Sequence, residues 1–262
     1  RASSGTFYFN FGDHYIINIY SNLSLVVIYA VGYKIGFIFT LIAWTPVEKM
    51  WDAEKYAVNK KPDAKIIYQK VFLYMNVVLF TIGLGVSLFV KDFLRIMSAP
   101  DFWPAYDVVQ IIIMAYIIQS WGRYCDLGIM LKKKTRQIAY AQWFAVFIVA
   151  IAYFALIPKF GIVGAEWATV IGFSAQFYGI IKKGKENYNM HLPWMKVFLI
   201  AVLAISCFSL PFFFPEALLL SFSLRVVVFV LFCSFLYILP ILHVEQKEEI
   251  KLNMKKFFML SQ

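Results

Sequence analysis

The sequence predicts an all-α integral membrane protein, and three features of its composition and pattern support this prediction. Hydrophobic residues make up 61% of the 262 residues, and charged residues only 15%. Soluble domains average about 45–50% apolar and about 25% charged residues. The apolar residues also form seven runs long enough to cross a hydrocarbon core of about 30 Å as helices. Soluble globular enzymes, disordered chains and disulfide scaffolds are therefore excluded.

The seven runs predict a seven-helix transmembrane bundle over residues 24–242. The expected spans are 24–45, 71–90, 106–131, 137–157, 161–181, 195–214 and 218–242. Residues 1–23 carry Asp13 and His14 within an apolar, aromatic stretch, so we expect the end of a truncated span and an outer interfacial segment. The chain starts at Arg1 and has no signal-peptide pattern, so we interpret it as the C-terminal part of a longer protein.

Loops rich in lysine and arginine alternate along the chain with loops that contain few of them. Eighteen of the 25 lie in segments 46–70, 132–136 and 182–196 and in the tail 243–262, which all fall on one side. Cytoplasmic loops of membrane proteins are enriched in Lys and Arg. We therefore expect a multi-pass protein with a cytoplasmic C-terminus. The outer loops are short and leave no room for a sizeable extramembrane domain.

Two segments on the predicted cytoplasmic side have an apolar stripe among charged residues. Residues 47–58 follow Pro46, and residues 243–262 form a lysine-rich amphipathic tail. Such helices bind at the surface of an anionic leaflet, so membrane lipids are expected partners.

Three charged residues inside predicted spans are the main candidate site residues. Lys34 falls near the middle of its span, while Arg123 and Asp126 lie one helical turn apart on the same face. A charge near the centre of a bilayer is costly, so such residues face a bundle interior or a wet cavity. Arg123 and Asp126 could neutralise each other. Alternatively, Lys34 and Arg123 line a cationic cavity for an anionic head group.

Small residues at four-residue spacing predict close helix contacts. Gly32 and Gly36 form one such motif, and Gly164, Ala168 and Gly172 form a second. Small residues at this spacing allow helix backbones to approach closely in membranes.

Two acidic residues near the outer ends of spans have a simpler interpretation. Asp107 and Glu166 each lie just inside a predicted helix N-terminus, where the helix dipole favours an acid.

The sequence offers no pattern for a catalytic residue, a metal site or a cofactor. Three cysteines and three histidines are scattered, and no phosphate loop, nucleophile elbow or zinc motif is present. The basic residues do not form a continuous stripe, so no nucleic acid partner is expected.

Several segments together resemble one family, the polysaccharide (O-antigen and repeat-unit) flippases of the multidrug/oligosaccharidyl-lipid/polysaccharide exporter superfamily. The similar stretches lie between residues 10 and 185, and they read DHYII at 13–17, VIYAVGYKI at 27–35, PDFWPA at 100–105, LKKKT at 131–135 and LIPKFGIVGA at 156–165, with Ala168 and Thr169 following. Arg123 and Asp126 depart from the family pattern, which is usually uncharged there.

The resemblance implies the C-terminal half of a two-bundle, MATE-like flippase fold in a bacterial inner membrane. The implied substrate is a polyprenyl-pyrophosphate-linked oligosaccharide, moved by alternating access, with no enzymatic activity and no cofactor. The N-terminal half of the same protein and a polysaccharide polymerase are the implied partners. Tyr33, next to Lys34 in the similar stretch, joins Lys34, Arg123 and Asp126 as a substrate-cavity candidate.

Four alternatives remain open. The chain could be a drug or metabolite antiporter of the same superfamily, a lipid II flippase, a membrane-embedded glycan-processing enzyme, or an assembly partner without a cavity. An intramembrane acid besides Asp126 favours the antiporter, and donor-sugar turnover favours the enzyme.

Overall fold

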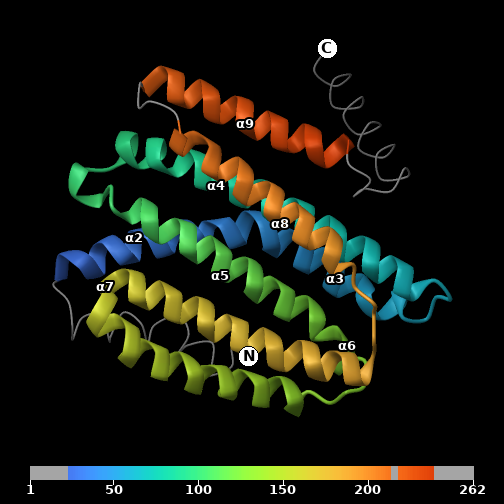
Figure 1. The fold of residues 1–262 in the computed structure, drawn as a ribbon. Helices are drawn as coiled ribbons and strands as arrows, with labels where there is room; N and C mark the ends of the chain where they lie inside the picture. Colours follow the sequence, from blue (N-terminus) through green and yellow to red (C-terminus); the bar gives the residue numbers. More distant parts are fainter. Residues whose placement is uncertain (1–22, 214–217, 239–262) are drawn as a thin grey trace. The chain divides into compact units, whose positions relative to one another are not determined.

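A computed structural model of the chain describes residues 23–213 and 218–238 (Figure 1). These residues form helices joined by short turns and contain no strands, which confirms the predicted all-α class for this part of the chain. The expected truncated span and outer segment, with Asp13 and His14, lie outside the described residues, as does the tail 243–262.

Four helical segments are long and apolar enough to cross a membrane. They are Val26–Val58, Ala64–Met97, Pro100–Met130 and Arg136–Asn187. Two shorter apolar helices cover Trp194–Ser209 and Phe222–Tyr237. The chain is thus compatible with a membrane protein, whereas the count of seven spans stays a prediction.

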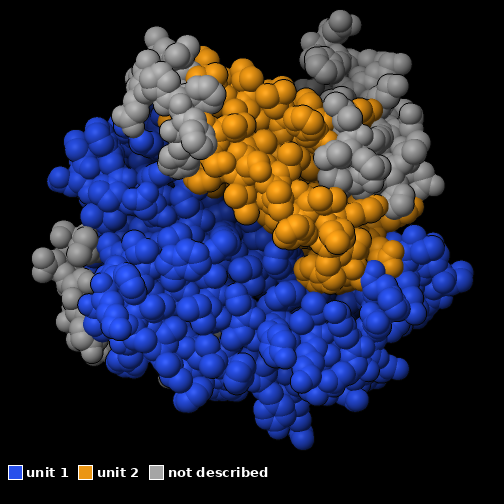
Figure 2. Space-filling model, in the orientation of Figure 1, with its two compact units in different colours: residues 1–68, 89–191 blue, residues 69–88, 192–262 orange. Residues whose placement is uncertain are grey.

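The chain divides into two compact units, shown in Figure 2. The first comprises residues 1–68 and 89–191, and the second residues 69–88 and 192–262. All candidate site residues named from the sequence belong to the first unit, which is described first.

The first long helix of unit 1 continues through a π-helical turn. Helix α2 (Leu23–Phe39) leads into η1 (Thr40–Trp44) and then α3 (Thr45–Val58), and the backbone angles at the joints are helical. Pro46 is the second residue of α3, just after the π-helical turn, and the helix continues through it. Segment 47–58, expected as a separate surface helix, therefore extends the helix that holds the predicted span 24–45.

Glycines bring α2 close to α5 (Ala105–Cys125). A Cβ on Gly32 would lie 2.4 Å from Cγ1 of Val108, and a Cβ on Gly36 2.3 Å from Cγ2 of Ile112. Both glycines of the first small-residue motif thus lie at a helix contact. The order of these contacts shows that α2 and α5 run parallel.

Helix α7 (Arg136–Asn187) consists of two arms joined at a kink (Figure 1). Pro158 precedes the kink, and Gly161 at its centre has φ 56° and ψ −130°, a conformation that suits glycine. The arms run antiparallel, because Gly179 packs against Ala141. The predicted spans 137–157 and 161–181 fall in separate arms.

The second small-residue motif lies just after the kink, in the second arm. Gly164 lies against the backbone carbonyl of Leu156 in the first arm, and Ala168 and Gly172 are buried. Small side chains therefore occupy the region where the two arms diverge.

The basic segments of unit 1 gather at one end, which we call the basic end. There, α3, the start of α4 (Ala64–Met97), α6 (Leu127–Met130) and the end of α7 meet. A Cβ on Gly128 would lie 2.7 Å from the carbonyl oxygen of Gly184, and the rings of Tyr68 and Tyr188 are 6.0 Å apart. Segments 46–68, 132–136 and 182–188 therefore share this end.

Unit 2 contains the middle of α4 together with α8 (Trp194–Ser209), η3 (Leu210–Phe213) and α9 (Leu218–Ile238). Phe72 of α4 packs on Trp194 with ring centroids 4.9 Å apart. Arg225 donates a hydrogen bond of 3.4 Å to the carbonyl of Leu88. This bond gives a backbone partner to a charge that lies within the predicted span 218–242.

Candidate functional site

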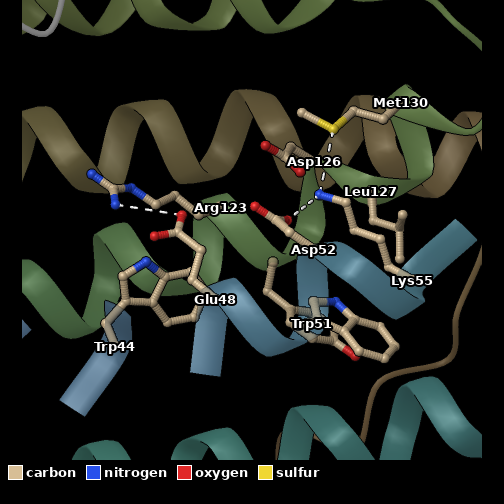
Figure 3. A pocket seen from close by; sticks show the side chains of 10 residues that line it. Trp44, Glu48, Trp51, Asp52, Lys55, Arg123, Asp126, Leu127 and Met130 are labelled. Atoms are coloured by element: carbon tan, nitrogen blue, oxygen red, sulfur yellow. Dashed lines mark hydrogen bonds and ion pairs between the residues drawn. The ribbon is translucent and has the colours of Figure 1, made fainter. Parts of the chain in front are cut away.

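A polar cavity of about 230 Å³ lies near the basic end of unit 1 (Figure 3). Helix α3 and the segment formed by α5 and α6 supply most of its lining. Five of its lining residues carry charge, namely Glu48, Asp52, Lys55, Arg123 and Asp126, and three are aromatic, namely Trp44, Trp51 and Tyr124.

Two acids of α3 pair with the two basic residues of the cavity. Arg123 Nη1 lies 3.6 Å from Glu48 Oε1, and Lys55 Nζ donates a hydrogen bond of 2.5 Å to Asp52 Oδ1. Figure 3 shows both pairs. The side chains of Arg123 and Glu48 are 43% and 31% exposed, so this pair is open to water or to a ligand.

Asp126 is left without a hydrogen-bond partner for its buried Oδ1 atom. The indole Nε1 of Trp44, which lines the same cavity, is also buried without a partner. Leaving such groups unsatisfied costs free energy. An acid at the C-terminal end of α5 also opposes the helix dipole. The cavity therefore presents one acceptor and one donor that a ligand or water can satisfy.

An aromatic cluster fixes one wall of this cavity. Trp51 stacks on Tyr124 with ring centroids 5.7 Å apart and an interplanar angle of 10°. The Tyr124 hydroxyl donates to the carbonyl of Tyr68 at 2.7 Å, and the Tyr68 hydroxyl donates to the carbonyl of Lys55 at 2.9 Å. These bonds hold α3, α5 and the start of α4 in place around the charged residues.

A smaller cavity of about 90 Å³ shares Arg123 and Asp126 with the first. Its other polar lining residues are three glutamines, contributed by α5 and by both arms of α7, namely Gln119, Gln142 and Gln176. Amide groups both donate and accept hydrogen bonds. The two cavities together form a polar region on both sides of Arg123 and Asp126.

The four predicted cavity residues separate into two pairs. Arg123 and Asp126 line the same cavities, yet the described ion pair of Arg123 is with Glu48. Lys34 is exposed on α2, and neither it nor Tyr33 lines these two cavities. Tyr33 is buried, with its ring 6.0 Å from that of Tyr116.

The charge balance of the larger cavity differs from the expected cationic cavity. Three acids and two bases line it, because Lys34 does not contribute and α3 adds two acids and one base. Glu48, Asp52 and Lys55 were not predicted as site residues from the sequence. Their spacing of four and three residues places them on one helix face, and this pattern could have identified them from the sequence. No comparable pattern marked the glutamines.

Within the part of the chain that the structure describes, no group of three or more His, Cys, Asp or Glu residues could hold a metal ion. Comparisons with protein-family models, curated proteins and solved structures found no match.

Proposed function

We propose that the chain is part of a multi-pass flippase that moves a polyprenyl-pyrophosphate-linked oligosaccharide across a bacterial inner membrane by alternating access. The single observation that carries the proposal is the cavity of charged and amide side chains within a bundle of membrane-compatible apolar helices. The sequence resemblance to polysaccharide flippases supports the choice of substrate. Under this proposal, an N-terminal half completes the transport path, and a polysaccharide polymerase uses the product.

The physical task is to carry a hydroxyl-rich, charged head group through about 30 Å of hydrocarbon. Each hydroxyl group moved without a hydrogen-bond partner would cost several kcal/mol. A polar cavity between helices replaces these lost water contacts, while the polyprenyl tail stays in lipid. Alternating exposure of the cavity to the two sides then completes the transfer.

The charge balance supports a role for this cavity in holding the sugar portion of the proposed substrate. A carboxylate such as that of Asp126 accepts hydrogen bonds from hydroxyl groups, and the amides of Gln119 and Gln176 both donate and accept them. The excess of acids over bases in the larger cavity disfavours the pyrophosphate there. Lys34, exposed elsewhere on α2, is the proposed contact for the pyrophosphate.

The position of the cavity is appropriate for loading from the cytoplasm. Arg123 is 18 residues beyond the start of α5, or about 27 Å along the helix axis, close to the thickness of the hydrocarbon core. The basic end lies next to it, and basic loops favour the cytoplasmic side. The proposed orientation therefore places the cavity at the side where lipid-linked sugars are made, with the C-terminus cytoplasmic.

A complementation assay in a strain lacking the full-length gene tests this proposal. We expect Arg123→Ala and Asp126→Asn to reduce surface polysaccharide strongly. Lys183→Ala, which removes an exposed ion pair with Glu186 away from the cavity, should leave it unchanged at equal membrane abundance. Normal surface polysaccharide in both cavity variants would refute the cavity assignment.

The antiporter alternative is favoured by two observations, the buried acid Glu166 within the predicted span 161–181 and the excess of acids beside the tryptophans of the larger cavity. Such a site attracts organic cations through carboxylates and aromatic faces. Binding of a fluorescent organic cation to the purified full-length protein, lost in Asp126→Asn, would support this second function. Binding of a lipid-linked oligosaccharide instead would support the flippase.

A further inference from the structure

Glu166 is a buried acid that the cavity does not use. It lies in the second arm of α7, five residues after Gly161, and the residue is fully buried. Neither carboxylate oxygen has a hydrogen-bond partner. The hydroxyl group of Thr169, three residues after Glu166, bonds instead to the hydroxyl group of Tyr153 at 3.1 Å.

The helix-dipole interpretation from the sequence does not account for this environment. The dipole acts mainly within the first turn of a helix, and Glu166 follows that turn. An acid that served as a cap would accept a hydrogen bond from a backbone N–H group, and Glu166 accepts none. A buried ionised carboxylate without a partner is among the most costly groups in a protein interior. A proton on the carboxylate removes the charge.

Asp107 is a charged neighbour of Glu166. It lies in the first turn of α5, its side chain is exposed, and its negative charge acts on Glu166. Binding of a proton forms an O–H bond on Glu166 and converts the carboxylate to a neutral acid. Release of the proton restores the carboxylate, so no other reactant is required.

The surroundings favour a proton over a metal ion. Metal cations such as Ca²⁺ and Mg²⁺ require about six oxygen ligands, including water. Among the described residues no group of three or more acids, histidines or cysteines could hold a metal ion, and Glu166 lines neither of the two cavities around Arg123. A proton needs only one oxygen atom.

The second arm of α7 connects Glu166 to the smaller cavity. Phe173, Gln176 and Ile180 line that cavity, and they lie 7, 10 and 14 residues after Glu166, which is helical spacing for a single face. We propose that Glu166 is a proton-binding site that couples protonation at one end of this arm to the cavity at the other. The inference rests on the proposed transport function and names the proton as the coupling ion.

Infrared difference spectroscopy of the full-length protein in lipid, between acid and alkaline pH, tests the site directly. A protonated carboxyl group without a hydrogen bond gives a C=O band at higher frequency than hydrogen-bonded acids. We expect wild type to show such a band at acid pH and to lose it at alkaline pH. The band should be absent from Glu166→Gln and unchanged in the control Asp101→Asn, an exposed acid in η2 (Pro100–Phe102).

Three results would overturn the proposal. They are the absence of the band from wild type at every pH, a band that persists unchanged at alkaline pH, and a band that remains in Glu166→Gln, which would belong to another buried acid such as Asp126. If Glu166→Gln does not fold, Glu166→Asp serves instead, and its band must shift in frequency. The spectrum does not depend on the substrate, so it tests proton binding separately from transport. If the band titrates but the Arg123 and Asp126 variants make normal surface polysaccharide, only the flippase proposal is refuted.

Discussion

Arg123 illustrates how a charged residue can serve recognition without adding much stability. Its ion pair with Glu48 spans 3.6 Å, and both side chains are partly exposed. Exposed ion pairs contribute about 0–1 kcal/mol, because water screens them and side-chain entropy opposes them. The arrangement thus leaves the guanidinium available to a ligand at little energetic cost.

We therefore predict that Arg123→Ala changes the free energy of unfolding by less than about 1 kcal/mol while transport is lost. Denaturant unfolding of the detergent-solubilised protein measures the first quantity, and surface polysaccharide measures the second. Lys183→Ala is the matched control, because it removes an exposed pair without lining the cavity. A large loss of stability in Arg123→Ala would show that the residue is structural.

Substitution by alanine should have opposite effects on stability at two buried glycines. Gly32→Ala places a Cβ 2.4 Å from Val108, so it forces helix α2 away from α5 and should destabilise the protein by about 1–3 kcal/mol. At Gly122 the nearest atom would be 3.8 Å away, so Gly122→Ala should be neutral or stabilise the helix by up to about 1 kcal/mol. Thermal unfolding of both variants in one detergent compares them. Equal effects would contradict the close contact.

At the scale of the elements, the kink in α7 allows one continuous segment to supply two antiparallel arms. Gly161 at its centre has no atom within 4 Å of a hypothetical Cβ, so space does not restrict substitution there. The restriction comes from the backbone, since φ 56° with ψ −130° is essentially accessible to glycine alone. The kink also sets where Glu166 lies.

Gly161→Ala should therefore destabilise the protein by about 1–3 kcal/mol through backbone strain alone. Phe160→Ala, at an exposed neighbouring position, is the control and should have a smaller effect. Unfolding curves for both variants measure the difference. An unaffected Gly161→Ala protein would mean that the arms can reach their positions through another turn.

Helix ends were harder to predict than helix locations. Hydropathy placed the apolar centre of α4 at 71–90, but the helix covers Ala64–Met97, because polar residues at its ends retain helical propensity. Pro46 suggested a break, whereas the π-helical turn η1 carries the chain through. Apolar runs report burial in lipid or protein, and they do not report where backbone hydrogen bonding stops.

At the scale of the whole chain, the sequence predicted the helical class. Arg123 and Asp126, which it marked as charged residues within one span, line the same two cavities. It did not predict that Glu48, 75 positions away, would pair with Arg123. It also could not reveal the contact between Gly128 and Gly184, because neither belongs to a small-residue motif. Periodicity identifies the face of one helix, whereas partners on another helix follow from packing across long sequence separations.

The gathering of basic segments at one end of unit 1 leads to a prediction about membrane topology. Lys60, Lys134 and Lys185 are exposed and lie in the segments of the basic end, while Asp101 and Lys159 are exposed in the short loops predicted on the opposite side. The enrichment of Lys and Arg in cytoplasmic loops places the first three inside the cell.

Single cysteines at these five positions, in a full-length protein without its native cysteines, should therefore react differently with a membrane-impermeant maleimide. We expect positions 101 and 159 to react in cells whose inner membrane is intact, and positions 60, 134 and 185 to react only after that membrane is permeabilised. Because the three basic segments share one end of a packed unit, they must change sides together. Uniform reversal would invert the proposed orientation and move the Arg123 cavity to the outer face, whereas labelling that divides the three would contradict a membrane-spanning arrangement of this unit.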